Sequence, residues 1–176
     1  MNIDYVFHFD QMKFMRSRIL DVSLHQGVCL SMCVDFIDRR KKKLPCDFIY
    51  FSQLYQFASL QRALSYGTEA GKIQDAVLFP NGRFKIDGRQ HAYLFLEQNP
   101  EYEFNPATLP YGDYIINIVY YNNSCHVIAL RNTACKIEVF DPNSGLFILK
   151  NIYDLKTHLK QKYKGICNYI YIYHCK

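Results

Sequence analysis

Cys29 is the residue of this sequence best placed for nucleophilic chemistry. It follows Gln26, Gly27 and Val28 at the point where a loop is expected to become a helix that runs to about Arg39. The helix is predicted from apolar residues at helical spacing, namely Met32, Cys33, Phe36 and Ile37. A cysteine in the first helical turn lies near unpaired backbone N–H groups and the positive end of the helix dipole, which favour the nucleophilic thiolate. Free cysteines are also among the most buried residue types, so a purely structural role in the core is the alternative.

A histidine and an aspartate are predicted to share one face of a β-sheet. A loop centred on Thr133 and Ala134 joins two predicted strands and would place His126 opposite Asp141. The same face carries four aliphatic residues, Ile128, Leu130, Ile137 and Val139. Directly opposed side chains have Cβ atoms about 5 Å apart, so the aspartate can accept a hydrogen bond from one imidazole nitrogen while the other faces away. Packing the Cys29 helix on this face would complete a Cys-His-Asp triad.

Taken alone, each of these residues also has a structural interpretation. A histidine on an apolar face is more often a hydrogen-bonded core residue than a catalyst, and residues 141–145, Asp-Pro-Asn-Ser-Gly, are a favourable turn sequence. The cysteine at a helix start, the facing His and Asp, and their order in the chain together favour catalysis. Cys33, Cys125 and Cys135 lack the paired C-x-x-C spacing of a metal site. We interpret them as small core residues and expect neither a metal nor a cofactor.

An acyl intermediate would need further support close to the thiol. The oxyanion requires the Cys29 backbone N–H and one more donor. Gln26 and Ser23 are the candidates by position, although either can instead be an ordinary loop residue or a helix cap. His91 is the alternative base if His126 does not serve.

Length and cysteine content bound the class of protein. The 176 residues are expected to form one domain, residues 1–176, with a core of ordinary size. Seven cysteines, an odd number without the spacing of a small disulfide scaffold, indicate reduced thiols and therefore a reducing compartment such as a cytosol. We expect no integral membrane segment, because no apolar stretch is long enough, and the first residues do not resemble a signal peptide.

The formal net charge of +5 is concentrated in one run of five basic residues, Arg39, Arg40, Lys41, Lys42 and Lys43. Such a run can make a weak contact with an anionic surface. It also lies at the predicted end of the Cys29 helix, where positive side chains complement the helix dipole. We favour the second interpretation and expect no nucleic-acid partner.

Helices dominate the first half of the predicted structure and strands the second. Helices are predicted at 11–20, 28–39, 47–65 and 153–163, and a small hairpin at 76–86. From residue 113 onward the hydrophobic pattern has period two, which predicts antiparallel strands at 114–121, 125–131, 136–140, 146–150 and 166–174. This order predicts an α+β fold in which N-terminal helices pack on a C-terminal antiparallel β-sheet.

Three short motifs resemble the YopT/AvrPphB family of bacterial effector cysteine proteases. They are Gly-Val-Cys at 27–29, Cys-His-Val-Ile-Ala-Leu at 125–130, and Phe-Asp-Pro-Asn-Ser-Gly at 140–145. The resemblance implies a papain-like fold and a catalytic triad in which Cys29 is the nucleophile, His126 the general base and later acid, and Asp141 the carboxylate that orients the histidine. It also implies export by a bacterium, without a cleaved signal, into the cytosol of a host cell.

The predicted function is hydrolysis of a peptide bond in a host protein substrate through a covalent acyl-enzyme. Acyl transfer and amide deamidation are alternatives, because both pass through the same thioester. A papain-like binding module without catalysis is a third possibility. The sequence does not predict the substrate.

Overall fold

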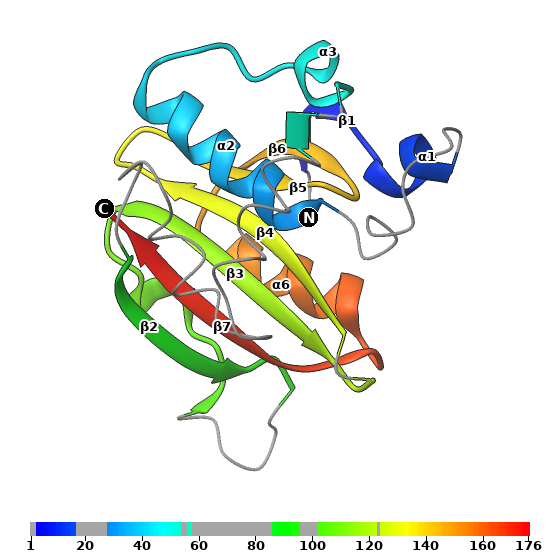
Figure 1. The fold of residues 1–176 in the computed structure, drawn as a ribbon. Helices are drawn as coiled ribbons and strands as arrows, with labels where there is room; N and C mark the ends of the chain where they lie inside the picture. Colours follow the sequence, from blue (N-terminus) through cyan, green and yellow to red (C-terminus); the bar gives the residue numbers. More distant parts are fainter. Residues whose placement is uncertain (1–2, 17–27, 54–55, 58–85, 96–101, 123) are drawn as a thin grey trace.

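The computed structural model describes residues 3–16, 28–53, 56–57, 86–95, 102–122 and 124–176. Within them lies one seven-stranded sheet in the order β1-β6-β5-β4-β3-β7-β2, with antiparallel neighbours throughout (Figure 1). The strands are β1 (Asp4–His8), β2 (Ile86–Tyr93), β3 (Gly112–Tyr120), β4 (Cys125–Asn132), β5 (Ile137–Asp141), β6 (Gly145–Leu149) and β7 (Cys167–Cys175). The helical segments are α1 (Gln11–Arg16), α2 (Cys29–Lys41), α3 (Phe48–Phe51), the 3₁₀ turn η3 (Pro106–Thr108) and α6 (Tyr153–Tyr163).

Both faces of the central strands are buried, each against a different helix. On β3, Ile115 packs in the cluster that contains α2, whereas Ile116 packs in the cluster that contains α6. On β4, Ala129 and Leu130 divide in the same way. Successive strand residues point to opposite faces, so a continuous apolar run is what a strand covered on both sides requires. Figure 1 shows α2 on one side of the sheet and α6 on the other.

The sequence predicts the second half of the chain well. Helix α6 has the predicted bounds, and each end of β3 to β7 lies within two residues of its predicted position. Helix α2 begins at Cys29 as predicted and extends two residues beyond Arg39. The antiparallel sheet with packed helices therefore agrees with the predicted α+β class, although β1 and β2 were not predicted.

The predicted helix at 47–65 is wrong in its extent. Asp47 caps it as expected, accepting a hydrogen bond from the Tyr50 N–H at 2.8 Å. The helix nevertheless ends at Phe51, and the Ser52 hydroxyl donates to the Ile49 carbonyl at 2.7 Å, a local bond that competes with helix continuation. Gln56 and Phe57 are helical again, so the predicted helix is interrupted after Phe51. Most of its remainder, and of the hairpin at 76–86, lies outside the described residues.

The predicted register between β4 and β5 is also wrong, by two positions. The turn lies one residue later in the chain than expected. Thr133 and Lys136 bond to each other through N–H···O contacts of 3.0 and 3.1 Å, so Asn132 and Ile137 form the first pair. A shift of two residues keeps every side chain on its predicted face. His126 and Asp141 therefore do share a face, but they meet diagonally and not directly across the ladder. The predicted packing of the Cys29 helix on that face is wrong, because α6 covers it and α2 packs on the opposite face, with Val127 and Ala129.

Strand β4 extends beyond its partner β5, and α2 occupies the space that this leaves. Pairing with β3 covers the whole of β4, whereas pairing with β5 covers only residues 129–132. The backbone of Val127 therefore has no β5 partner. Instead, its carbonyl accepts a hydrogen bond from the Cys33 thiol at 3.3 Å, and its N–H donates to the sulfur of Cys29. This contact brings the start of α2 to the start of β4.

The basic run mainly anchors the end of α2. Arg40 pairs with Glu138 at 2.8 Å, and Lys42 pairs with Asp38 at 2.9 Å. Arg39 donates to the Pro45 carbonyl at 2.6 Å, and its guanidinium lies 3.5 Å from the centre of the Tyr50 ring. These contacts support the helix-end interpretation of residues 39–43.

All seven cysteines are free thiols, but they differ in exposure. Cys33 is buried as expected, whereas Cys125 and Cys135 are exposed, so their interpretation as core residues is wrong. Cys125 is the first residue of β4, and Cys135 lies in the turn before β5, so both lie at the margin of the sheet. Among the described residues, no group of three or more His, Cys, Asp or Glu side chains could hold a metal ion. No helix in the same residues is long and apolar enough to cross a membrane.

Candidate active site

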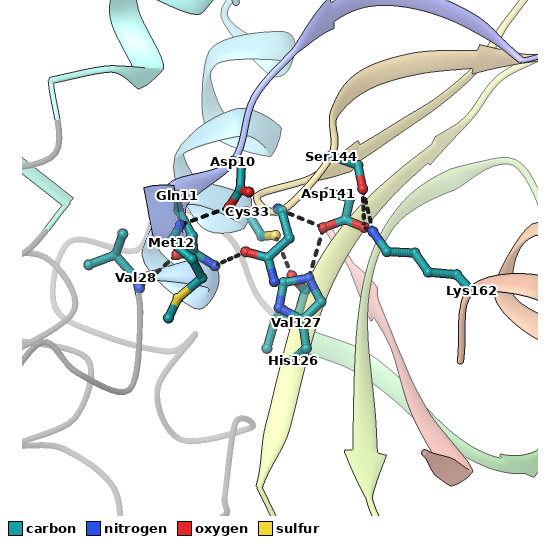
Figure 2. A network of polar contacts seen from close by, with 11 residues as sticks. Asp10, Gln11, Met12, Val28, Cys33, His126, Val127, Asp141, Ser144 and Lys162 are labelled. Carbon is teal, nitrogen blue, oxygen red and sulfur yellow. Dashed lines mark hydrogen bonds and ion pairs between the residues drawn. The ribbon is translucent and has the colours of Figure 1, made fainter. Parts of the chain in front are cut away.

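His126 and Asp141 form a buried hydrogen-bonded pair at the end of the sheet. The Nε2 atom of His126 lies 2.8 Å from Oδ1 of Asp141, and the two residues are 4% and 1% exposed. With Nε2 directed to the carboxylate (Figure 2), the other ring nitrogen, Nδ1, is the atom available to the Cys29 thiol, with which His126 is also hydrogen-bonded. The imidazole thus lies between a carboxylate and a thiol, which is the order of a catalytic triad.

Cys29 is the first residue of α2 and is 9% exposed. Burial alone raises the pKa of its thiol, because it disfavours the charged form. The hydrogen bond and positive charge of His126, together with backbone N–H groups of Val127 and Leu30, outweigh burial and lower the pKa below its ordinary value. The Leu30 N–H belongs to the first turn of α2, where the positive end of the helix dipole also favours the thiolate.

The pKa of His126 moves in the opposite direction. Burial lowers it, but the charge and hydrogen bond of Asp141, with a smaller contribution from Cys29, raise it to about 9. A raised imidazole pKa and a lowered thiol pKa both favour a thiolate–imidazolium pair near neutral pH. This is the reactive form of a cysteine nucleophile.

The carboxylate of Asp141 is held by a tight turn at residues 141–145. Its Oδ1 atom also accepts a hydrogen bond from the Asn143 N–H at 2.8 Å, and Oδ2 accepts one from the Ser144 hydroxyl at 3.3 Å. Lys162 of α6 contacts Oδ2 as well. Burial raises the pKa of Asp141, but the charges and hydrogen bonds of His126 and Lys162 hold it well below its usual range.

Gln11 connects the start of α2 to this turn. It is 2% exposed, and its Oε1 atom accepts a hydrogen bond from the Val28 N–H at 2.9 Å. Its Nε2 donates to Oδ1 of Asn143, also at 2.9 Å, and its backbone N–H donates to the Pro142 carbonyl at 2.8 Å. Figure 2 shows Gln11 next to Val28, in one polar network with His126 and Asp141. One side chain thereby links the residue before Cys29 to the residues after Asp141.

The remaining sequence candidates do not join this group. Gln26 and Ser23 lie outside the described residues. His91 lies on the edge strand β2, separated from β4 by β7 and β3, where it is exposed and stacks on Tyr171 with ring centres 5.0 Å apart. The structure therefore gathers Cys29, His126 and Asp141 and leaves His91 elsewhere.

Sequence reasoning missed Lys162, which contacts Asp141, and Gln11, which contacts the residues next to Cys29 and Asp141. Gln11 opens a short helix with no recognisable motif, and its partners are distant in the chain. Lys162 is one of several lysines on α6 and follows no pattern that would single it out. Only the packing of α6 on the sheet brings it to Asp141.

Comparison with known proteins relates this chain to others by fold alone. No protein-family model matches the sequence, and no curated protein matches it. Among solved structures, it is similar to that of the Pseudomonas avirulence protein AvrPphB, with a TM-score of 0.57 and 16% sequence identity, over 87% of this chain and 93% of that chain. The protein thus has a mixed fold of helices and antiparallel sheet similar to that of AvrPphB, a papain-like protease.

Proposed function

We propose that the protein is a cysteine protease that hydrolyses a peptide bond with Cys29 as nucleophile, His126 as general base and acid, and Asp141 as the group that orients the imidazole. The observation that carries the proposal is the continuous series of hydrogen bonds from the Cys29 thiol through His126 to Asp141. The fold similarity to AvrPphB supports it. Residues 1–176 would form one catalytic domain.

The reaction follows from the protonation states that the site favours. The Cys29 thiolate attacks the carbonyl carbon of the substrate, and the negative charge moves to the carbonyl oxygen near the start of α2. The His126 imidazolium then donates its Nδ1 proton to the departing amine, which leaves a thioester on Cys29. Next, His126 removes a proton from water, and the resulting hydroxide releases the acid and regenerates the thiolate. No cofactor is needed at any step.

We also propose that the substrate is a protein in the cytosol of a host cell. Similarity to an avirulence protein supports this location. The seven free thiols are in keeping with a reducing compartment.

The first test measures the reactivity of Cys29 towards iodoacetamide as a function of pH, with peptide mapping by mass spectrometry. We expect rapid alkylation of Cys29 near pH 6, and a loss of at least ~10-fold in rate in His126→Ala, because the imidazolium stabilises the thiolate. Cys125 is an internal control, because the residue is exposed at the start of β4 while partial desolvation of its sulfur and the nearby Cys29 raise the pKa of its thiol. Alkylation of Cys29 only at the pH where Cys125 reacts would contradict the proposal.

The second test identifies the reaction. Wild type and Cys29→Ala are incubated with a host-cell protein extract, and new protein N-termini are mapped by mass spectrometry. New N-termini that depend on Cys29 are expected for a protease. Conversion of glutamine to glutamate, or acylation of an acceptor, without new N-termini would show that the same thioester serves a deamidase or an acyltransferase.

A further inference from the structure

Lys162 of α6 contacts Asp141 on the oxygen that His126 does not use. Oδ1 is taken by the imidazole and the Asn143 N–H, each at 2.8 Å. Oδ2 receives the Lys162 ammonium and the Ser144 hydroxyl, and Lys162 also donates to that hydroxyl (Figure 2). The two carboxylate oxygens therefore have separate sets of partners, and rotation of the carboxylate would break both sets.

The other lysines of α6 show that this contact is specific to one position. Lys156 pairs with Glu103 at 2.7 Å, and Lys160 contacts the other oxygen of the same glutamate. Glu103 lies between β2 and η3 and is not a triad residue. Lys162 points instead to the end of β5, and its side chain is 26% exposed while that of Asp141 is 1% exposed. The lysine thus reaches from the surface to a buried carboxylate.

Lys162 and His126 are the two residues that pair with Asp141, and their charges lower the pKa of its carboxylate. The other titratable groups near the pair come from α2, α6 and strands β1, β3, β4 and β7; they are Tyr5, Cys29, Cys33, Tyr120, Cys125, His158, Tyr163 and Cys167. The pKa values of the tyrosines and of every cysteine here except Cys29 are raised, with burial as the largest cause, and these groups are therefore neutral at pH 7. Burial also lowers the pKa of His158 to about 4, with Lys162 contributing, so this histidine is neutral too.

We propose that Lys162 is a positioning residue of the triad, which fixes the Asp141 carboxylate so that Oδ1 stays on His126 and offsets part of its negative charge. The inference rests on the proposed function, because it assigns Lys162 a role in that site. A bare buried carboxylate would stabilise the imidazolium further. The imidazolium would then be a weaker acid towards the departing amine, and less of His126 would be in the neutral form that takes a proton from water. Lys162 counteracts this effect, because its positive charge lies against Oδ2 and offsets part of the negative charge of the carboxylate.

The test is a pH titration of His126 in the full-length protein, monitored by NMR of its imidazole nitrogens. The signal is assigned by its absence in His126→Gln. In Lys162→Met we expect the pKa of His126 to rise by about one unit, since a neighbouring positive charge has been removed. Lys162→Arg, which keeps the charge, should restore a value close to that of wild type.

Lys160→Met is the matched control. It removes an ion pair from the same helix, but the partner of that lysine is Glu103 and not a triad residue. It should leave the His126 titration unchanged, and its melting temperature sets the scale for the loss of one α6 ion pair. An unchanged His126 pKa in Lys162→Met, or an equal shift in Lys160→Met, would overturn the inference.

Failure of the proposed function would look different. In that case wild type itself would show His126 titrating near the ordinary value of about 6.5 and no His126-dependent alkylation of Cys29 by iodoacetamide. A wild type with an activated Cys29, combined with no effect of Lys162→Met, would refute the role of Lys162 alone.

Discussion

The charges at the candidate site cancel at the level of single residues. In the reactive form, the Cys29 thiolate and Asp141 carboxylate carry two negative charges, while the His126 imidazolium and Lys162 ammonium carry two positive ones. Burying an isolated charge is costly, whereas a balanced and hydrogen-bonded group recovers much of that cost. The balance explains how the site can keep Asp141 ionised at 1% exposure.

The free energy of unfolding should depend on the protonation of His126. We use Cys29→Ala to measure this dependence, because the variant removes the thiol that titrates together with the imidazole. The folded-state pKa of His126 is raised above its unfolded value of about 6.5, so the stabilisation is fully present below that pH and is lost as pH rises through the folded pKa. In wild type that pKa is about 9; without the thiolate it should be somewhat lower. In Cys29→Ala, the free energy of unfolding from urea titrations should therefore fall by roughly 1–3 kcal/mol between pH 6 and pH 9.

The double variant Cys29→Ala, His126→Gln is the control for this measurement. It lacks the group that titrates in this range, so its stability should change much less over the same pH interval. An equal decrease in both variants would mean that another group causes the pH dependence.

At the scale of elements, the sequence could predict what depends on local pattern. The period-two strands, the α6 bounds and the start of α2 at Cys29 follow from hydrophobic spacing. The register of β4 and β5 was off by two because it depends on the Thr133–Lys136 turn, whose hydrogen bonds cannot be read from hydrophobic pattern. The faces of His126 and Asp141 were nevertheless predicted, since a shift of two preserves the alternation. Gln11 and Lys162 depend on packing between distant elements, for which the sequence carries no local signal.

Gln11 should couple the start of α2 to the Asp141 turn. Gln11→Ala removes one buried and one partly buried hydrogen bond, and leaves the Val28 N–H and the side-chain Oδ1 of Asn143 without these partners. We expect a loss of about 1–3 kcal/mol in the free energy of unfolding, together with slower alkylation of Cys29. Urea denaturation and iodoacetamide kinetics measure the two effects.

A second variant at Gln11 and a control at Gln53 test this interpretation. Gln11→Glu keeps an acceptor for Val28 but faces Asn143 Oδ1 with an oxygen, so it should also slow Cys29 alkylation. Gln53→Ala, at an exposed glutamine, should change neither measurement. Normal Cys29 reactivity in Gln11→Ala would show that the bridge serves stability alone.

At the scale of the whole molecule, the candidate site lies where four separate parts of the chain meet. The N-terminal segment, α2, the β4–β6 meander and α6 each contribute a residue to it. Strand β1 pairs with β6 and runs directly past the Asp141 turn, where the Phe9 N–H donates to the Ser144 carbonyl at 3.2 Å. Changes at this junction should therefore disturb both the sheet edge and the site.

Gly145 tests this junction, with Gly165 as its match. Both have positive φ, of 109° and 78°. A Cβ at Gly145 would lie 2.1 Å from the Phe7 carbonyl oxygen, whereas one at Gly165 would meet nothing within 4 Å. Gly145→Ala should lower the free energy of unfolding by roughly 2–4 kcal/mol and Gly165→Ala by about 1 kcal/mol. Similar losses in the two variants, measured by urea denaturation, would show that β1 does not hold the turn closely.

The position of α2, beside the end of β4 that does not pair with β5, has a consequence for folding. The contact between Cys33 and Val127 spans 94 positions, so it can form only after a large loop has closed. Until then Cys29 is an ordinary thiol, because neither Val127 nor His126 is beside it. Short pulses of alkylating reagent at successive times of refolding would therefore measure when α2 docks on the sheet. Docking would be marked by the time at which Cys29 becomes reactive at mildly acidic pH.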